Sequence, residues 1–179
     1  MKRFFLFYAT LVGTLGIHTG CTQDLKWSAV DRMIARAFPE ALQITTDSLA
    51  LLLAAPSMRK PLLLDTRPEA EYAVSHLQGA LRIDPDTEDF AFLDTLARDA
   101  PIVAYCSVGY RSSQIVQRLQ EAGFTNASNL KGSIFQWANE GRPIYRDDAP
   151  IHQVHPYDKI WGSLLDKPLR AYTPTPEKQ

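Results

Sequence analysis

The sequence predicts an α/β fold: one domain with a mostly parallel, short-stranded sheet and helices on both of its faces. Short apolar runs such as Leu62–Asp65 and Pro101–Tyr105 have the length of strands rather than helices. These runs alternate with segments of helical periodicity, which is typical of strand–helix–strand units. The 159 residues that follow the first 20 of the 179 are enough for one domain with a full core.

The elements are expected in the following order. The first is an amphipathic helix within residues 22–41 that Pro39 ends, and Thr46 or Asp47 is expected to cap the next helix. Strands are expected at residues 43–45, 62–65, 80–83, 101–105 and 127–130, and helices at residues 49–53, 68–72, 90–98, 112–122 and 134–139.

Four segments are expected along the chain. Residues 1–20 have the pattern of a signal peptide, residues 21–41 form an N-terminal linker and helix, residues 42–145 form the domain, and residues 146–179 form a C-terminal extension with a disordered end. Apolar residues at helical spacing between Tyr157 and Leu165 predict a short helix in the extension, and we expect this helix to pack on the domain.

The segment from Cys106 to Ser112 carries most of the information about function. Cys106 directly follows an apolar run, Gly109 lets the loop turn tightly, and Arg111 adds a fixed positive charge just before a helix. In such a loop, backbone N–H groups and the helix N-terminus can surround an anion. These surroundings favour the reactive thiolate, so Cys106 and Arg111 are predicted to be catalytic.

The rest of this loop is predicted to bind substrate. Ser107, Val108 and Tyr110 are expected at its mouth, and Gly109 and Ser112 within it. The alternative is a buried structural cysteine, which is how most free cysteines behave. A cysteine that serves only packing would need neither the glycine nor the arginine.

Several motifs together resemble the rhodanese-type sulfurtransferase family. The loop matches the family's pattern Cys-x-x-Gly-x-Arg-Ser, and similar matches are Leu63–Arg67, Glu71-Tyr72, His76–Ala80, and Leu130 with Gly132 and Trp137. The resemblance covers roughly residues 42 to 145. The sequence departs from the family at Ser75 and Ser133, where the family usually has glycine, and at Gln78, where it usually has proline.

The resemblance implies a sulfurtransferase that carries sulfur on Cys106. The expected donor is thiosulfate or a persulfide, the expected acceptor is cyanide, a small thiol or a protein cysteine, and no cofactor is expected. Because Ser107, Val108 and Tyr110 carry no charge, persulfides are favoured over thiosulfate. The alternatives are a binding module without catalysis and, more remotely, a phosphatase. Related phosphatases have a loop that is one residue longer.

Three further residues in the motifs are expected to be structural. Asp65 and Arg67 follow a strand and are predicted to form an ion pair that holds adjacent loops. His76 could titrate near neutral pH, but its place in the motif favours a hydrogen-bonded turn.

The N-terminus predicts export. Lys2 and Arg3 precede an apolar stretch that is too short for a confident membrane span, and Gly20-Cys21 resembles a bacterial lipoprotein site. His18 stands where that pattern usually has leucine. The expected location is the periplasm or outer envelope, with membrane contact only through a lipid on Cys21 or an uncleaved anchor.

Charge and histidine content exclude other partners. Without its first 20 residues, which hold two basic and no acidic side chains, the chain's formal net charge falls from −1 to −3. A mildly acidic chain argues against nucleic acid as a partner. His152 and His155 lack the further ligands that a structural metal site needs, so no metal is expected.

Overall fold

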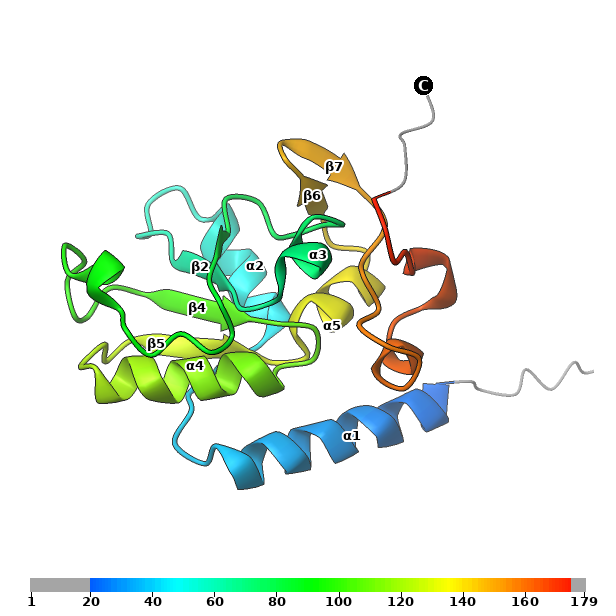
Figure 1. The fold of residues 1–179 in the computed structure, drawn as a ribbon, viewed down its shortest axis with the longest axis horizontal. Coiled ribbons are helices and arrows are strands. Elements are labelled where there is room, and N and C mark those ends of the chain that lie inside the picture. Colours follow the sequence, from blue (N-terminus) through cyan, green and yellow to red (C-terminus); the bar gives the residue numbers. More distant parts are fainter. Residues whose placement is uncertain (1–19, 175–179) are drawn as a thin grey trace, which may run out of the picture.

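A five-stranded parallel sheet forms the centre of the protein in the computed structural model, which describes residues 20–174 (Figure 1). The strand order is β1-β5-β4-β2-β3, and a separate antiparallel hairpin is formed by β6 and β7. The helices are α1 (Gly20–Ala37), α2 (Thr46–Ala54), α3 (Glu69–Tyr72), α4 (Tyr110–Glu121) and α5 (Ser133–Asn139), with 3-10 turns η1 (Ala91–Leu93), η2 (Trp161–Leu164) and η3 (Lys167–Leu169). The strands are β1 (Gln43–Ile44), β2 (Leu62–Asp65), β3 (Leu81–Arg82), β4 (Ile102–Tyr105), β5 (Ala127–Leu130), β6 (Ile144–Arg146) and β7 (Ala149–Ile151). The predicted fold class is confirmed.

Helices cover both faces of the sheet because successive side chains of a strand point to opposite sides. In β4, Val103 and Tyr105 belong to the core beside α2 and α5, whereas Ile102 and Ala104 belong to the core beside α4. Figure 1 shows α4 on one side of the sheet, and α2 and α5 on the other. Both faces are therefore buried, which explains why these strands have almost continuous apolar sequences.

Two terminal segments pack on this domain. Val30 and Ile34 of α1 are buried in the same core cluster as Leu164 and Leu165 of the C-terminal segment. The side-chain amide of Gln23 in α1 donates to the carbonyl oxygen of Leu164 at 3.2 Å. The C-terminal segment therefore lies against the domain and α1, as predicted for its apolar residues.

Three local predictions were wrong. The cap of α2 is Thr45, whose hydroxyl accepts the Ser48 N–H at 3.1 Å, rather than Thr46 or Asp47. The helix expected at residues 90–98 is only η1, because i→i+3 bonds bring the apolar residues Phe90 and Leu93 to the same buried side.

The third concerns the C-terminal segment, where the helix expected at residues 157–165 is only η2. The β6–β7 hairpin was not predicted from the sequence; its turn contains Asp147 with a φ of 51°.

The predictions for the N-terminus are not addressed by this structure. The expected signal peptide, apart from Gly20 at the start of α1, and the side chain of Cys21 lie outside the described residues, as does the expected disordered end after Pro174. Within residues 20–174, every helix is too short or too polar to cross a membrane.

Candidate active site

Cys106 lies where β4 ends and the loop to α4 begins. The cysteine is 1% exposed, and its sulfur accepts the Gly109 N–H at 3.2 Å. Gly109 has a φ of 112°, and a Cβ at this position would lie 3.1 Å from Asn129 Nδ2 and 3.2 Å from Ile34 Cδ1. Glycine is therefore required here both by the backbone conformation and by the close packing.

Opposing effects act on the Cys106 thiol. Burial raises its pKa, but the positive charge of Arg111 and hydrogen bonds from Ser112 and Gly109 lower the pKa by more. The Ser112 hydroxyl also donates to Asn129 Oδ1 at 2.6 Å, which fixes Ser112 beside the sulfur. The net result is a pKa below that of an ordinary cysteine, which favours the thiolate.

The start of α5 supports the loop from behind. Ser133 Oγ accepts the Cys106 N–H at 3.1 Å and donates to the Leu130 carbonyl at 3.1 Å. The Ile134 N–H donates to the carbonyl oxygen of Cys106 at 3.2 Å. Ser133 has a φ of 49°, which is unfavourable for a residue with a side chain. A glycine would adopt this φ more easily, but it could not supply the hydroxyl that accepts the Cys106 N–H.

Arg111 is bound by a carboxylate that sequence reasoning did not identify as a site residue. Its guanidinium donates to both oxygens of Glu71, at 2.8 and 3.0 Å, and to Ser107 Oγ at 3.1 Å. Ser107 Oγ in turn donates to Glu71 at 2.7 Å. Burial raises the pKa of Glu71, but Arg111 and Ser107 lower it by more. The motif Glu71-Tyr72 was the available signal for this role.

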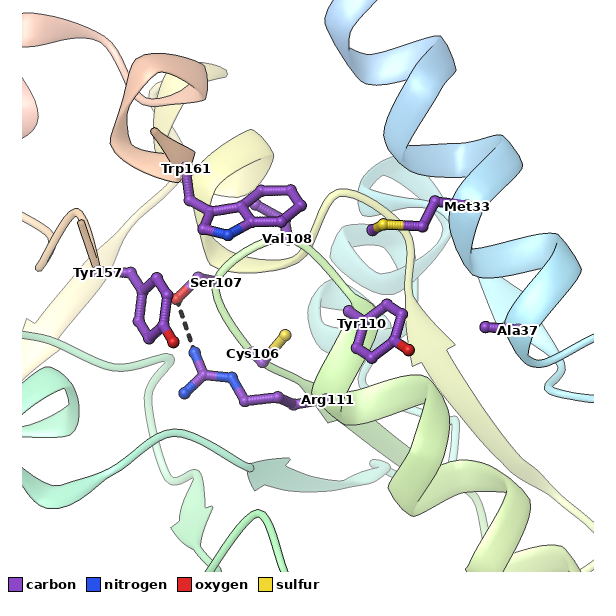
Figure 2. Close-up of a pocket in the computed structure, with 9 residues that line it drawn as sticks. All are labelled: Met33, Ala37, Cys106, Ser107, Val108, Tyr110, Arg111, Tyr157 and Trp161. Carbon is purple, nitrogen blue, oxygen red and sulfur yellow. Dashed lines mark hydrogen bonds between the residues drawn. The ribbon is translucent and has the colours of Figure 1, made fainter. Parts of the chain in front are cut away.

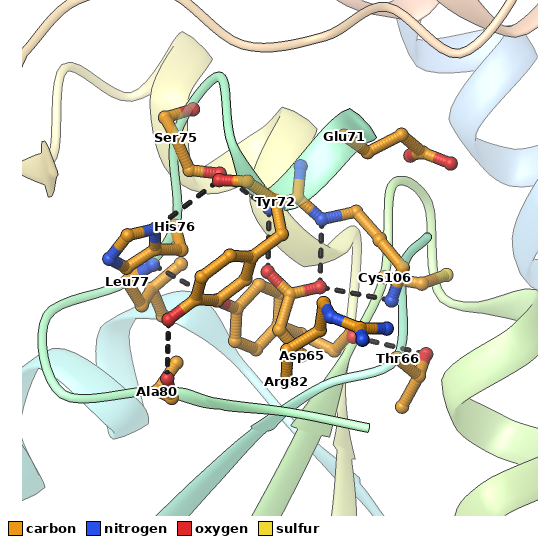
Figure 3. A network of polar contacts seen from close by, with 12 residues as sticks. Asp65, Thr66, Glu71, Tyr72, Ser75, His76, Leu77, Ala80, Arg82 and Cys106 are labelled. Atoms are coloured by element: carbon orange, nitrogen blue, oxygen red, sulfur yellow. Dashed lines mark hydrogen bonds and ion pairs between the residues drawn. The ribbon is translucent and has the colours of Figure 1, made fainter. Parts of the chain in front are cut away.

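The predicted ion pair between Asp65 and Arg67 is present and fully buried. Arg67 Nε and Nη2 donate to the two oxygens of Asp65 at 2.8 and 2.6 Å, and Nη2 also donates to the Ser75 carbonyl at 2.6 Å. His76 Nδ1 lies 3.3 Å from the carbonyl oxygen of Tyr72. These contacts link the end of β2 to the segment at residues 75–76 (Figure 3).

The His76 imidazole also stacks on the Tyr72 ring, with 4.0 Å between their centroids. The Tyr72 hydroxyl donates to the Ala80 carbonyl at 2.9 Å (Figure 3). His76 is hydrogen-bonded, as expected, but it forms an antiparallel bridge with Tyr145 of β6 rather than a turn, and it does not line the pocket at Cys106.

A pocket of about 300 Å³ opens above Cys106 (Figure 2). Ser107, Val108 and Tyr110 line it, in agreement with their expected place at the mouth. Gly109 and Ser112, which were also expected to bind substrate, are not among its lining residues, and Ser112 has no exposed surface. Their contacts are with the Cys106 sulfur and with the packed interior behind it.

Sequence reasoning missed two sides of this pocket. Met33 and Ala37 of α1 line one side, and Tyr157 and Trp161 of the C-terminal segment line another. The Tyr157 ring centroid lies 5.1 Å from the Arg111 guanidinium carbon. No local sequence motif indicates these contacts, because they depend on how both terminal segments pack on the domain.

His152 and His155 both lie in the C-terminal segment. Within residues 20–174 there is no group of three or more potential metal ligands. His155 Nδ1 instead accepts the Tyr157 N–H at 3.1 Å.

Comparison with known proteins agrees with the geometry of the loop and sheet. The family model described as "Rhodanese-like domain" matches residues 45–140. The chain is 34% identical over 88 residues to a probable adenylyltransferase/sulfurtransferase MoeZ of Mycobacterium tuberculosis. The aligned segment covers 49% of this chain and 22% of that protein. It is 32% identical over 102 residues to a sulfurtransferase of Allochromatium vinosum, covering 57% of this chain and 92% of the relative.

A solved structure also has the same fold. The rhodanese-like domain of the Anabaena protein Alr3790 superimposes with a TM-score of 0.52 at 28% identity, covering 59% of this chain and 80% of that one. The match to residues 45–140 spans more than half of the sequence and includes Glu71, Cys106 and Arg111. The chain belongs to the rhodanese-like family.

Proposed function

We propose that this protein is a sulfurtransferase that carries a sulfane sulfur on Cys106. The observation that carries the proposal is the environment of this sulfur: it accepts the Gly109 N–H at 3.2 Å, has a lowered thiol pKa, and faces a pocket. The relatives named as sulfurtransferases support the same chemistry.

The first step forms a persulfide. The Cys106 thiolate attacks the outer sulfur of a donor R–S–SH, the donor's S–S bond breaks, and its electron pair leaves with R–S⁻. The scheme uses no separate base, because a lowered pKa raises the fraction of Cys106 that is already thiolate. In the second step an acceptor thiolate attacks the outer sulfur of Cys106–S–SH and releases the Cys106 thiolate. Two covalent steps predict ping-pong kinetics.

Arg111 acts in this scheme through its charge. The guanidinium is fixed by Glu71 and Ser107, and its side chain remains 23% exposed at the pocket. Its fixed positive charge stabilises the Cys106 thiolate when it attacks the donor in the first step and when it is released in the second. The site therefore needs no metal or cofactor for these steps.

The test is direct loading of the protein. Purified protein is incubated with thiosulfate, or with a low-molecular-weight persulfide, and its intact mass is measured. We expect one added sulfur atom on Cys106 and none in Cys106→Ser, with unchanged circular dichroism in both proteins. If neither donor adds sulfur to the folded wild type, the proposal is wrong.

A second candidate is a binding module without catalysis. It is favoured by the near-complete burial of Cys106 and by the Arg111–Glu71 pair, which leaves the loop with little unpaired charge. In that case Cys106→Ala would keep both the fold and the cellular role. Loss of sulfur transfer and of that role in folded Cys106→Ala would exclude this candidate.

We also propose that the protein works in the cell envelope, with small thiols or a protein cysteine as acceptor. The proposal rests on the residues around Gly20-Cys21, which resemble a lipoprotein site. Palmitate labelling of the wild type, compared with Cys21→Ser in the same cells, tests it. Equal labelling, or none in either, would exclude a lipid on Cys21.

A further inference from the structure

The pocket above Cys106 is completed by parts of the chain outside residues 45–140, the part that the family model matches. Met33 and Ala37 come from α1, and Tyr157 and Trp161 come from the C-terminal segment. We call these four residues the terminal collar. Figure 2 shows Cys106 in the lower half of the view, with Trp161 above it on one side and Met33 above it on the other. A compound that reaches the sulfur through this mouth must pass the collar.

The collar is held in place by contacts between its two segments. Lys26 of α1 donates to Ser163 Oγ at 3.3 Å, next to the Gln23–Leu164 bond described above. At the other end of α1, Phe38 makes an edge contact with the Tyr110 ring, with 5.0 Å between their centroids. These contacts fix the position of the two segments, so the collar is a structured part of the pocket wall.

Tyr157 has a backbone conformation that indicates a specific role. Its φ of 63° is rare for an aromatic residue and costs conformational energy. The residue keeps this conformation with its N–H bonded to His155 Nδ1, and its ring faces the Arg111 guanidinium. Strained residues of this kind cluster at ligand sites.

The charges at the pocket do not suit a second anion beside the Cys106 sulfur. In the part of the chain that the structure describes, the pocket lining contains one charged side chain, Arg111, and both its charge and Ser107 Oγ are already bound to Glu71. A dianion such as thiosulfate would lose its water here without gaining an unpaired cation, which is unfavourable. The exposed lining is mainly hydrocarbon and aromatic, so an apolar group gains from burial.

We propose that the terminal collar selects a sulfur acceptor or donor whose body is apolar and carries no charge apart from the reacting sulfur, and disfavours small compounds with a further anionic group. A volume of about 300 Å³ is at the lower end for ligand pockets, so the compound is small. This inference rests on the proposed function. The step is R–S⁻ + Cys106–S–SH → R–S–SH + Cys106–S⁻, in which the bond between the two sulfurs of Cys106 breaks and its electron pair stays on Sγ.

The first test measures sulfur discharge. Cys106 is loaded with benzyl persulfide, a donor with an apolar body, the excess is removed, and discharge rates are measured with benzyl mercaptan and with thioglycolate. Each rate is divided by that of the same thiol with glutathione persulfide in solution, which removes differences in intrinsic nucleophilicity. We expect a normalised preference of about tenfold for benzyl mercaptan. Equal normalised rates would overturn the inference.

Variants assign the preference to the collar. Trp161→Ala and Tyr157→Gly should each reduce it severalfold, and glycine suits the backbone of residue 157. Ile160→Ala is the matched control, because Ile160 is 77% exposed, neighbours Trp161, and does not line this pocket. An unchanged preference in both folded collar variants would overturn the inference.

A second measurement is independent of sulfur transfer. Alkylation of Cys106 by N-benzyliodoacetamide and by iodoacetate is compared in the wild type and the same variants, each rate normalised to N-acetylcysteine. The collar predicts the same preference for the uncharged reagent, and its loss in Trp161→Ala. If neither benzyl persulfide nor inorganic polysulfide loads sulfur while this preference holds, the proposed function fails and the selectivity of the collar stands. If Cys106 takes up sulfur without either preference, the collar inference alone fails.

Discussion

Replacing Asp65 with asparagine should destabilise the protein strongly, because it leaves a buried cation without its partner. Asp65 and Arg67 both have side chains with no exposed surface, and three hydrogen bonds from Arg67 end on the Asp65 carboxylate. Burial lowers the pKa of Arg67, but the Asp65 carboxylate raises it by more, so Arg67 stays charged. Asparagine keeps the shape of the side chain and removes its charge.

The expected loss is about 3–5 kcal/mol of unfolding free energy, the range found when one partner of a buried ion pair is removed. Domains of this size have about 5–15 kcal/mol in total. The loss is therefore a large share of the stability of the whole protein. The Ser75 carbonyl still accepts a hydrogen bond from Arg67, but it cannot replace the missing negative charge.

The assay is urea unfolding followed by tryptophan fluorescence and circular dichroism. Asp94→Asn is the matched control, because the Asp94–Arg98 pair is exposed, with side chains 64% and 51% accessible. An exposed pair of this kind contributes about 0–1 kcal/mol. If Asp65→Asn costs no more than Asp94→Asn, the reasoning about the buried pair is refuted.

Four other predictions concern the loop. Alkylation of Cys106 by iodoacetamide should have a lower pH midpoint than alkylation of N-acetylcysteine, and Arg111→Gln should move the Cys106 midpoint to higher pH because it removes the charge that lowers the pKa; an unmoved midpoint would contradict this. The lowered native pKa of Glu71 contributes stability that is fully present above its unfolded pKa of about 4.3, and that stability is lost as the pH falls through the native pKa. Glu71→Gln lacks this contribution, so its urea midpoint should fall less on acidification than the midpoint of the wild type. Ser133→Ala should cost about 1–3 kcal/mol in chemical denaturation by leaving the Cys106 N–H without an acceptor, and Ser133→Gly should cost less because its φ is positive. Gly109→Ala should cost about 1–3 kcal/mol in the same assay, and a stability equal to the wild type would show that the loop relaxes freely.

Local sequence predicted the elements that carry strong periodicity or a clear breaker. The strands Leu62–Asp65 and Ala127–Leu130 were predicted at their observed bounds, and α4 was predicted within two residues. Prediction from local sequence failed where tertiary packing determines whether a segment forms an α-helix or a 3-10 turn. The segment at residues 90–98 is apolar enough for a helix, but burial of Phe90 and Leu93 favours a tight 3-10 turn.

The sequence by itself determined the loop that carries Cys106, because the spacing of Cys106, Gly109 and Arg111 is local and is tied to a backbone geometry that only glycine adopts easily. Tertiary structure alone decided what surrounds that loop. Glu71 meets Arg111 across 40 residues of chain, and α1 and the C-terminal segment meet above Cys106. Such contacts depend on how buried surfaces of distant segments fit together, and no short-range pattern encodes that fit.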